Sequence, residues 1–188
     1  MQNPFLFLLL VTGIHCSIIP FASGTHVTLT VANYQNCFGS TTTGAVIGFG
    51  ASFSTIPWSN AGINLTECTA CFWAINMAFV VPRDGVIKSL GGSFSLADPL
   101  VLGTSNVTII IQLYANTNHA DPMFFEPLSE TLIVLSPFTG TNSLGATKFG
   151  STNPKIPVKL GYRLLLFARN TGLCSVTGYI SGGLDIGK

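Results

Sequence analysis

Short apolar runs, separated by turn residues, recur along the chain from about residue 26. The run 26–31 alternates between polar and apolar positions, which predicts a β-strand with one buried face. The run 106–115 is continuously apolar at its centre, which predicts a strand buried on both faces. We expect a core strand at 162–169, a closing strand inside a sheet at 176–186, and further strands at 45–53, 63–66, 72–81, 86–96, 130–135 and 156–160.

Turn-forming residues mark the connections between these runs. Pro-Arg-Asp-Gly at 82–85 joins two β-rich runs, so Arg83 and Asp84 are expected to be solvated turn residues. Pro20 excludes a central strand position, which makes 17–24 a connector, and Pro157 predicts that 156–160 is an edge strand. We expect polar loops at 33–43, 57–62, 116–127 and 137–154.

The fold class follows from the number and spacing of the runs. No window shows sustained helical periodicity with capping residues, so we expect almost no helix. Roughly eight to ten strands over about 165 residues are typical of an all-β sandwich or jelly roll. We therefore predict a β head over residues 24–188.

The most apolar run is Pro-Phe-Leu-Phe-Leu-Leu-Leu-Val at 4–11, and three interpretations compete for it. A secretion signal needs a positive start and a small-residue cleavage site, but no Lys or Arg precedes Arg83, and His15 precedes Cys16. A membrane anchor needs roughly 20 apolar residues. The third interpretation, a strand-forming arm over residues 1–23, is favoured; its inter-subunit residues would be Phe5, Leu6, Phe7, Leu8, Leu9, Leu10 and Val11.

Charge is scarce throughout the chain. The net charge is +1, 8% of residues are charged against a typical ~25%, 47% are hydrophobic, and the mean hydropathy is +0.54. This composition predicts an obligate oligomer that covers apolar surface in subunit contacts. A basic patch for nucleic acid is absent from the sequence, and no run after residue 11 is long enough to span a membrane.

Five cysteines allow several kinds of chemistry. Cys68 and Cys71 form a C-x-x-C pair, which fits a redox motif or half of a zinc site. The expected β fold lacks the strand-to-helix context of a redox motif, and the histidines lack ligand spacing, so disulfides are favoured in an oxidising compartment. The odd count leaves at least one cysteine unpaired or joined to another subunit, with Cys16 on the arm the natural intermolecular candidate. Candidates for disulfides are Cys16, Cys37, Cys68, Cys71 and Cys174.

No recognisable frame of catalytic residues occurs in the sequence. Asp121 and Glu126 share a predicted loop with His119, which makes a weak site at best, and a solvated loop is the favoured interpretation. We therefore expect no enzyme activity, no metal and no cofactor.

Five stretches occur in the same order in one known family: Ile-Ile-Pro-Phe-Ala-Ser-Gly at 18–24, Met-Ala-Phe-Val-Val-Pro-Arg-Asp-Gly-Val-Ile-Lys-Ser-Leu at 77–90, Gln-Leu-Tyr at 112–114, Arg-Leu-Leu-Leu at 163–166 and Thr-Gly-Tyr-Ile-Ser-Gly-Gly-Leu at 177–184. From about 18 to 186 the chain resembles the carboxy-terminal domain of the collagen-like exosporium glycoproteins of Bacillus, of the BclB type. The resemblance implies a spore-surface location and a trimeric jelly roll similar to tumour-necrosis-factor and C1q heads.

The sequence departs from that family in two ways. Family members carry a collagen-like region before the head, whereas these 188 residues contain no period-three glycine repeat and begin with the apolar arm. The cysteines from Cys37 to Cys71 also fall outside the family pattern. These departures put the role of a stalk-borne tip in doubt, but not the head.

Two function hypotheses remain. The first is a structural, self-assembling subunit of the spore surface, in the exosporium or in an appendage fibre, whose partners are copies of itself and a spore-surface anchoring protein. Homotrimeric heads would be linked by arms that add a strand to a neighbouring trimer, which gives an open filament, unless the arm folds back on its own head. The alternative is a C1q-like or lectin-like binding head that mediates adhesion to a ligand or host surface through the loops 116–127 or 137–154.

Overall fold

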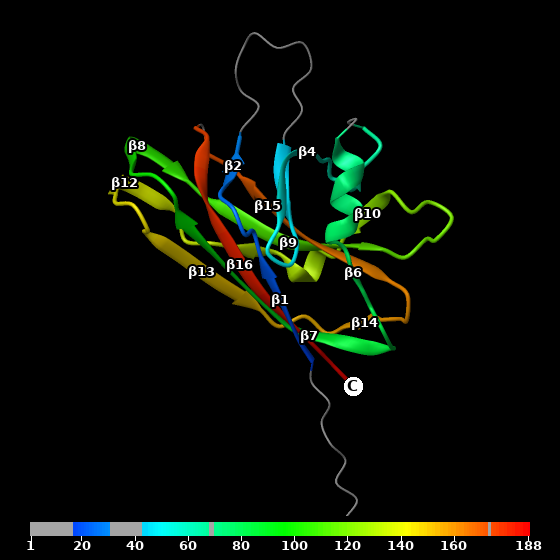
Figure 1. The fold of residues 1–188 in the computed structure, drawn as a ribbon. Helices are drawn as coiled ribbons and strands as arrows, with labels where there is room; N and C mark the ends of the chain where they lie inside the picture. Colours follow the sequence, from blue (N-terminus) through cyan, green and yellow to red (C-terminus); the bar gives the residue numbers. More distant parts are fainter. Residues whose placement is uncertain (1–16, 31–42, 68–69, 173) are drawn as a thin grey trace, which may run out of the picture.

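The computed structural model describes residues 17–30, 43–67, 70–172 and 174–188. Its strands form two large antiparallel sheets and a separate two-stranded sheet (Figure 1). The first sheet has the order β1-β16-β7-β13, with β14 also paired to β7 and β2 to β16. Its strands are β1 (Ser17–Ala22), β2 (Val27–Leu29), β7 (Gly85–Leu96), β13 (Thr147–Thr152), β14 (Ile156–Val158) and β16 (Val176–Gly187).

The second sheet has the order β4-β3-β15-β9-β10-β5, with β11 paired to β9 and β6 to β15. Its strands are β3 (Thr43–Ile47), β4 (Ser52–Pro57), β5 (Ile63–Asn64), β6 (Phe79–Val80), β9 (Ile109–Asn116), β10 (Phe124–Pro127), β11 (Ile133–Val134) and β15 (Arg163–Asn170). A two-stranded sheet of β8 (Leu100–Val107) and β12 (Phe138–Asn142) projects at the upper left of Figure 1. The described helical segments are two 3₁₀ helices, η1 (Cys71–Met77) and η2 (Ser129–Thr131).

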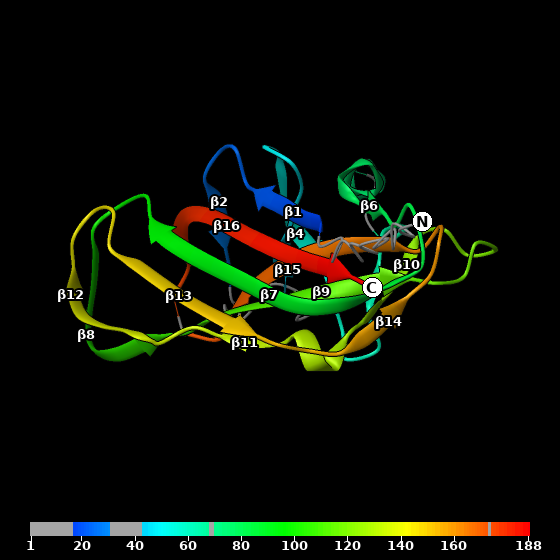
Figure 2. The same ribbon diagram turned by 90° about the horizontal axis from the view of Figure 1, so that it is seen from below.

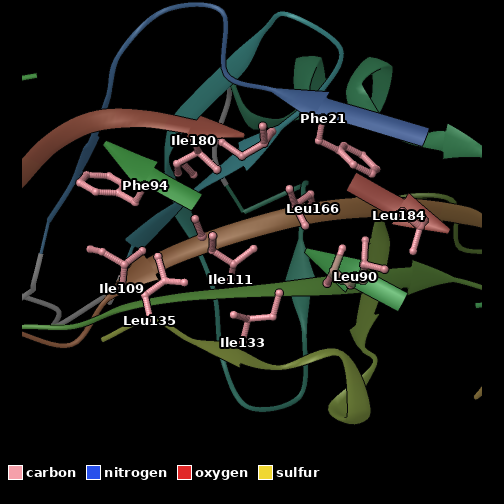
Figure 3. Packing of buried hydrophobic residues seen from close by; sticks show 14 of the residues in the cluster. Phe21, Leu90, Phe94, Ile109, Ile111, Ile133, Leu135, Leu166, Ile180 and Leu184 are labelled. Atoms are coloured by element: carbon pink, nitrogen blue, oxygen red, sulfur yellow. The ribbon is translucent and has the colours of Figure 1, made fainter. Parts of the chain in front are cut away.

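The main core lies between the two sheets, of which Figure 2 gives a second view. Leu90 and Phe94 of β7 and Ile180 and Leu184 of β16 pack with side chains of the second sheet such as Leu166 of β15 (Figure 3). The structure is therefore an all-β sandwich of the jelly-roll type, as the run pattern predicted.

A second core covers the other face of the second sheet. Tyr114 of β9 and Phe167 of β15 point to this side and pack with Ile56 and Phe125, while the alternate residues of the same strands join the main core. Every residue of β9 is buried, which confirms the predicted two-faced burial. Residues 48–78, which contain β4, β5 and η1, supply much of this cover, so the chain itself closes the outer face of the second sheet.

Four local predictions were wrong. The expected connector at 17–24 contains strand β1, which lies at the sheet edge, where Pro20 costs no ladder hydrogen bond. The expected strand at 72–81 is largely η1, where Cys71 and Ala74 are both buried three residues apart, which is the period of a 3₁₀ helix. The expected loop 137–154 contains β12 and β13, and the long strand expected at 106–115 is divided between β8 and β9.

Several other predictions are confirmed. The closing strand β16 lies between β1 and β7, inside the first sheet. β15 is a core strand, and β14 pairs with β7 alone. Apart from these predictions, the described residues contain no helix that is long and apolar enough to cross a membrane.

Candidate functional site

No segment among the described residues covers the outer face of the first sheet, and we call it the open face. Its residues are those that alternate with the core residues along β13, β7, β16 and β1. In register, Phe149 lies opposite Ser93, which lies opposite Ser181. The next row across the sheet is Ser151, Gly91, Gly183 and Pro20.

The sequence of β7 explains why few side chains rise from this face. Its inward positions after Ser89 carry the core residues Leu90, Phe94 and Leu96, while its outward positions carry only serine and glycine. A Cβ added at Gly91 or at Gly183 would have no atom within 4 Å, so both glycines face open space. From this low surface rises Phe149, whose side chain is 83% exposed. An exposed ring above a serine and glycine floor is a surface that another protein can cover closely.

Asp185 provides the charge on this face. It pairs in register with Ser89 and with Ile18, which is 78% exposed, and these residues line a hollow of about 260 Å³. One carboxylate oxygen of Asp185, Oδ1, is buried and has no hydrogen-bond partner among the described residues. A buried polar atom without a partner costs roughly 1–3 kcal/mol, so a donor from outside the chain would stabilise it.

A second candidate site is the hollow between β9 and β10, which we call the loop hollow. It measures about 120 Å³ and is lined by Ala115, Asn116, Thr117, Asn118, Asp121, Phe124 and Glu126. The structure thus brings Asp121 and Glu126 together, as their shared loop suggested. His119 does not line this hollow, and its ring lies beside Gly161 instead.

Asn116 holds the loop hollow in shape, and sequence reasoning missed it. Its side-chain amide donates hydrogen bonds of 2.6 Å to the carbonyl oxygens of Asp121 and Phe124, and Arg163 donates to the carbonyl of Pro122 in the same loop. Asn116 is 2% exposed, and its Oδ1 is buried without a hydrogen-bond partner in the described part of the chain. The lining is rich in acceptors and contains an aromatic ring, which suits a ligand with several hydroxyl groups.

The cysteines and the predicted turn residues have the following places. Cys71 is buried and disulfide-bonded, whereas Cys174 is a free, half-buried cysteine. The Asp84 carboxylate accepts the N–H of Leu160 at 2.8 Å, and Arg83 donates to the Ser17 hydroxyl at 3.3 Å. The remaining predicted residues lie outside the described part of the chain: Phe5, Leu6, Phe7, Leu8, Leu9, Leu10, Val11, Cys16, Cys37 and Cys68.

The perturbed ionisable groups lie mainly around the second core. Burial raises the pKa of the Tyr114 hydroxyl, although the nearby Arg169 guanidinium opposes this. Burial lowers the pKa of Arg169, which stacks 4.3 Å from the ring centre of Trp58, and it also lowers the pKa of Arg163. Across the residues that the structure describes, no three His, Cys, Asp or Glu side chains are grouped to hold a metal ion.

Comparisons with known proteins place the chain near one sequence relative. It is similar to a collagen-like protein. Over 179 residues, which are 90% of this chain, it is 34% identical to Collagen-like protein 1 of Acanthamoeba polyphaga mimivirus, and it spans 18% of that protein's length. No family model matches the chain.

Comparison of the folds also found solved structures. Among them is the stem and receptor-binding domain of the spike protein P1 from bacteriophage PM2, with 11% identity. The match covers 92% of this chain and 96% of that chain, with a TM-score of 0.32, which is below the level at which two folds are equivalent.

Proposed function

We propose that this chain is the self-assembling subunit of a surface structure, in which heads associate as homotrimers through the open face. The observation that carries this proposal is the contrast between the two sheets. The outer face of the second sheet is covered by residues 48–78 of the same chain, whereas the open face is nearly uncharged and displays Phe149 at 83% exposure. A stable interface needs about 800 Å² from each partner, so the contact would extend over several strands of this face.

The energetics of the open face support a protein partner. Burial of Phe149 against a second copy would contribute about 2 kcal/mol per subunit. Serine and glycine around it let the two backbones approach closely, and a donor on the partner would satisfy the buried Oδ1 of Asp185. The similarity to a collagen-like protein supports a structural role, and the resemblance to BclB-type heads supports a trimer on the outside of a spore, in the exosporium or in an appendage fibre.

The oligomeric state of the full chain tests this proposal. Phe149→Asp should convert the wild-type trimer into a monomer in size-exclusion chromatography with light scattering, because it places a charge in an otherwise apolar contact. Val101→Asp is the matched control, since Val101 is 74% exposed on the two-stranded sheet of β8 and β12, outside the open face. A wild-type protein that is monomeric at high concentration would refute the proposal, and so would a Phe149→Asp variant that remains trimeric.

The link between trimers is proposed to be the arm. Strand β1 is the edge of the first sheet, and between Ser17 and Phe21 its outer side makes no backbone hydrogen bond in the described part of the chain. Since β1 begins at Ser17, residues 1–16 precede the sheet and are the segment available for exchange. An unpaired strand edge accepts an added strand, so the arm of one trimer would pair with the next, and a spore-surface protein would anchor the assembly.

Truncation separates the arm from the head. Removal of residues 1–16 should leave folded trimers that form no fibres by negative-stain electron microscopy, and Leu8→Asp should have nearly the same effect. Long fibres from the truncated protein would exclude arm exchange while leaving the trimer proposal intact.

A second candidate function, adhesion by a binding head, is favoured by one observation in the loop hollow. The buried Oδ1 of Asn116 lacks a partner beside the carboxylates of Asp121 and Glu126, which is an arrangement that accepts hydrogen bonds from the hydroxyl groups of a sugar. A glycan array probed with the purified protein should give hits that Asp121→Asn and Glu126→Gln abolish. An array without hits would remove this candidate.

A further inference from the structure

A third hollow lies at the end of the first sheet, and three of its five lining residues are lysines. It measures about 540 Å³ and is lined by Val86, Lys88, Asn153, Lys155 and Lys188. We call it the lysine hollow. The chain has eight Lys and Arg residues in all, so this one hollow gathers three of them.

Strand pairing explains why lysines distant in the sequence meet here. Ile156 of β14 pairs with Ile87 of β7, which brings Lys155 beside Lys88. Gly187 of β16 pairs with Val86 on the other side of β7, which brings Lys188 to the same place. Figures 1 and 2 both show the end of the chain beside β14 and the beginning of β7.

The ammonium groups make no ion pair with an Asp or Glu side chain in the described part of the chain. No Asp or Glu carboxylate lies within 4.0 Å of the ammonium group of Lys88, Lys155 or Lys188. A Cβ added at Gly187 would lie 2.6 Å from Nζ of Lys88, so the absence of a side chain there lets the ammonium group lie across β16. Like charges held together cost free energy, and a bound anion removes that cost.

We propose that the lysine hollow binds phosphate or sulfate groups carried on a saccharide. Ammonium groups are strong donors to these oxyanions. Apart from the ammonium groups and Asn153, the lining consists of Val86 and the methylene stems of the lysines. These offer an apolar surface to the C–H faces of a sugar ring. All the lining residues belong to one chain, so the site does not depend on the proposed self-association.

Fluorescence anisotropy with the full chain tests this site. The probe is a fluorescein-labelled, fully sulfated heparin hexasaccharide, its desulfated counterpart is the first control, and inorganic phosphate is the competitor. We expect the sulfated probe to bind, the desulfated probe to bind at least tenfold more weakly, and inorganic phosphate to displace the probe. A labelled, phosphorylated hexasaccharide run in parallel distinguishes phosphate from sulfate as the preferred group. The affinity should fall as salt rises from about 50 to about 300 mM, because ions screen the lysines.

Charge-neutralising variants locate the binding. Lys88→Gln and Lys155→Gln should each weaken binding about threefold, and the double variant about tenfold. Lys148→Gln is the matched control, since Lys148 lies over the Phe138 ring at 5.5 Å and does not line the hollow. Melting temperatures within about 1 °C of the wild type would show that the variants fold. Equal binding by the double variant and the wild type would overturn the proposal. Binding to phosphatidylglycerol vesicles but not to either labelled hexasaccharide would also overturn it, in favour of a membrane surface.

Discussion

Two glycines on strand β16 should respond to alanine in opposite directions, although they are five residues apart on the same strand. Gly178 faces the main core between β2 and β7, and a Cβ there would lie 2.4 Å from both Cζ of Phe94 and the carbonyl oxygen of Ser95. Gly183 faces outward, and a Cβ there would meet nothing within 4 Å. The pair therefore tests which face of β16 is buried, and with it the register of the first sheet.

The expected magnitudes follow from these contacts. The new methyl group of Gly178→Ala would be about 1 Å too close to a backbone atom that cannot rotate away, so the strand must shift. We expect a loss of about 1–3 kcal/mol in the free energy of unfolding, which is typical of an overpacked core. Gly183→Ala should instead gain about 0.4–1 kcal/mol, because alanine lowers the entropy of the unfolded chain without adding a clash.

Urea and thermal unfolding of both variants measure the difference. For a chain of this length 1 kcal/mol corresponds to roughly 2–4 °C, so the two melting temperatures should differ by about 3–16 °C. The melts should be repeated at two protein concentrations, because assembly through the open face would make the melting temperature depend on concentration. Equal effects of the two substitutions would refute the assigned register, and so would a larger loss at Gly183 at the lowest concentration.

Three further predictions concern the second core and the cysteines. The wild-type free energy of unfolding should fall as the pH rises above about 10, because the unfolded chain ionises its tyrosines there while the raised pKa keeps Tyr114 neutral in the folded state. Tyr114→Phe should reduce this fall in urea titrations, and an equal fall in the variant would contradict the burial of the Tyr114 hydroxyl. Cys71→Ala should lower the free energy of unfolding by about 2–4 kcal/mol, a reductant should do the same to the wild type, and Cys174→Ser should leave the melting curve unchanged. Arg169→Gln should cost about 1 kcal/mol through the lost stacking on Trp58, and an unchanged urea midpoint would contradict that contact.

Local patterns predicted the strands that are buried most completely. β9 and β15 carry long apolar runs because both their faces are covered. A strand of this kind has few positions that face water, so polar residues rarely interrupt the run. β12 and β13 escaped prediction because serine, threonine and glycine dominate them, and an exposed strand on the surface needs few apolar residues. Helix η1 was mistaken for a strand because a short apolar run fits a buried helix and a buried strand equally well.

The sequence also pointed to only some of the residues of the candidate sites. Asp121 and Glu126 were noticed because they are close in the sequence, and they do share a hollow. Asn116 was missed because it ends a strand whose pattern gives no sign of its two hydrogen bonds to the next loop. The lysine hollow was missed because its residues come from three segments that only strand pairing brings together.

A comparison of the two sheets explains the low charge of the chain. Many apolar side chains of residues 48–67 and 70–78 pack on the outer face of the second sheet, and the disulfide-bonded Cys71 is one of the buried residues there. No comparable segment among the described residues covers the open face. Along β7, serine and glycine residues nevertheless alternate with buried residues as regularly as in a core strand. If the chain acted alone, charged residues on this face would keep it soluble at no cost to the core. Their near absence supports the proposal that a second copy covers the face. Gly91→Lys should therefore dissociate the assembly in size-exclusion chromatography without unfolding the head, because a side chain at Gly91 meets no atom of its own chain.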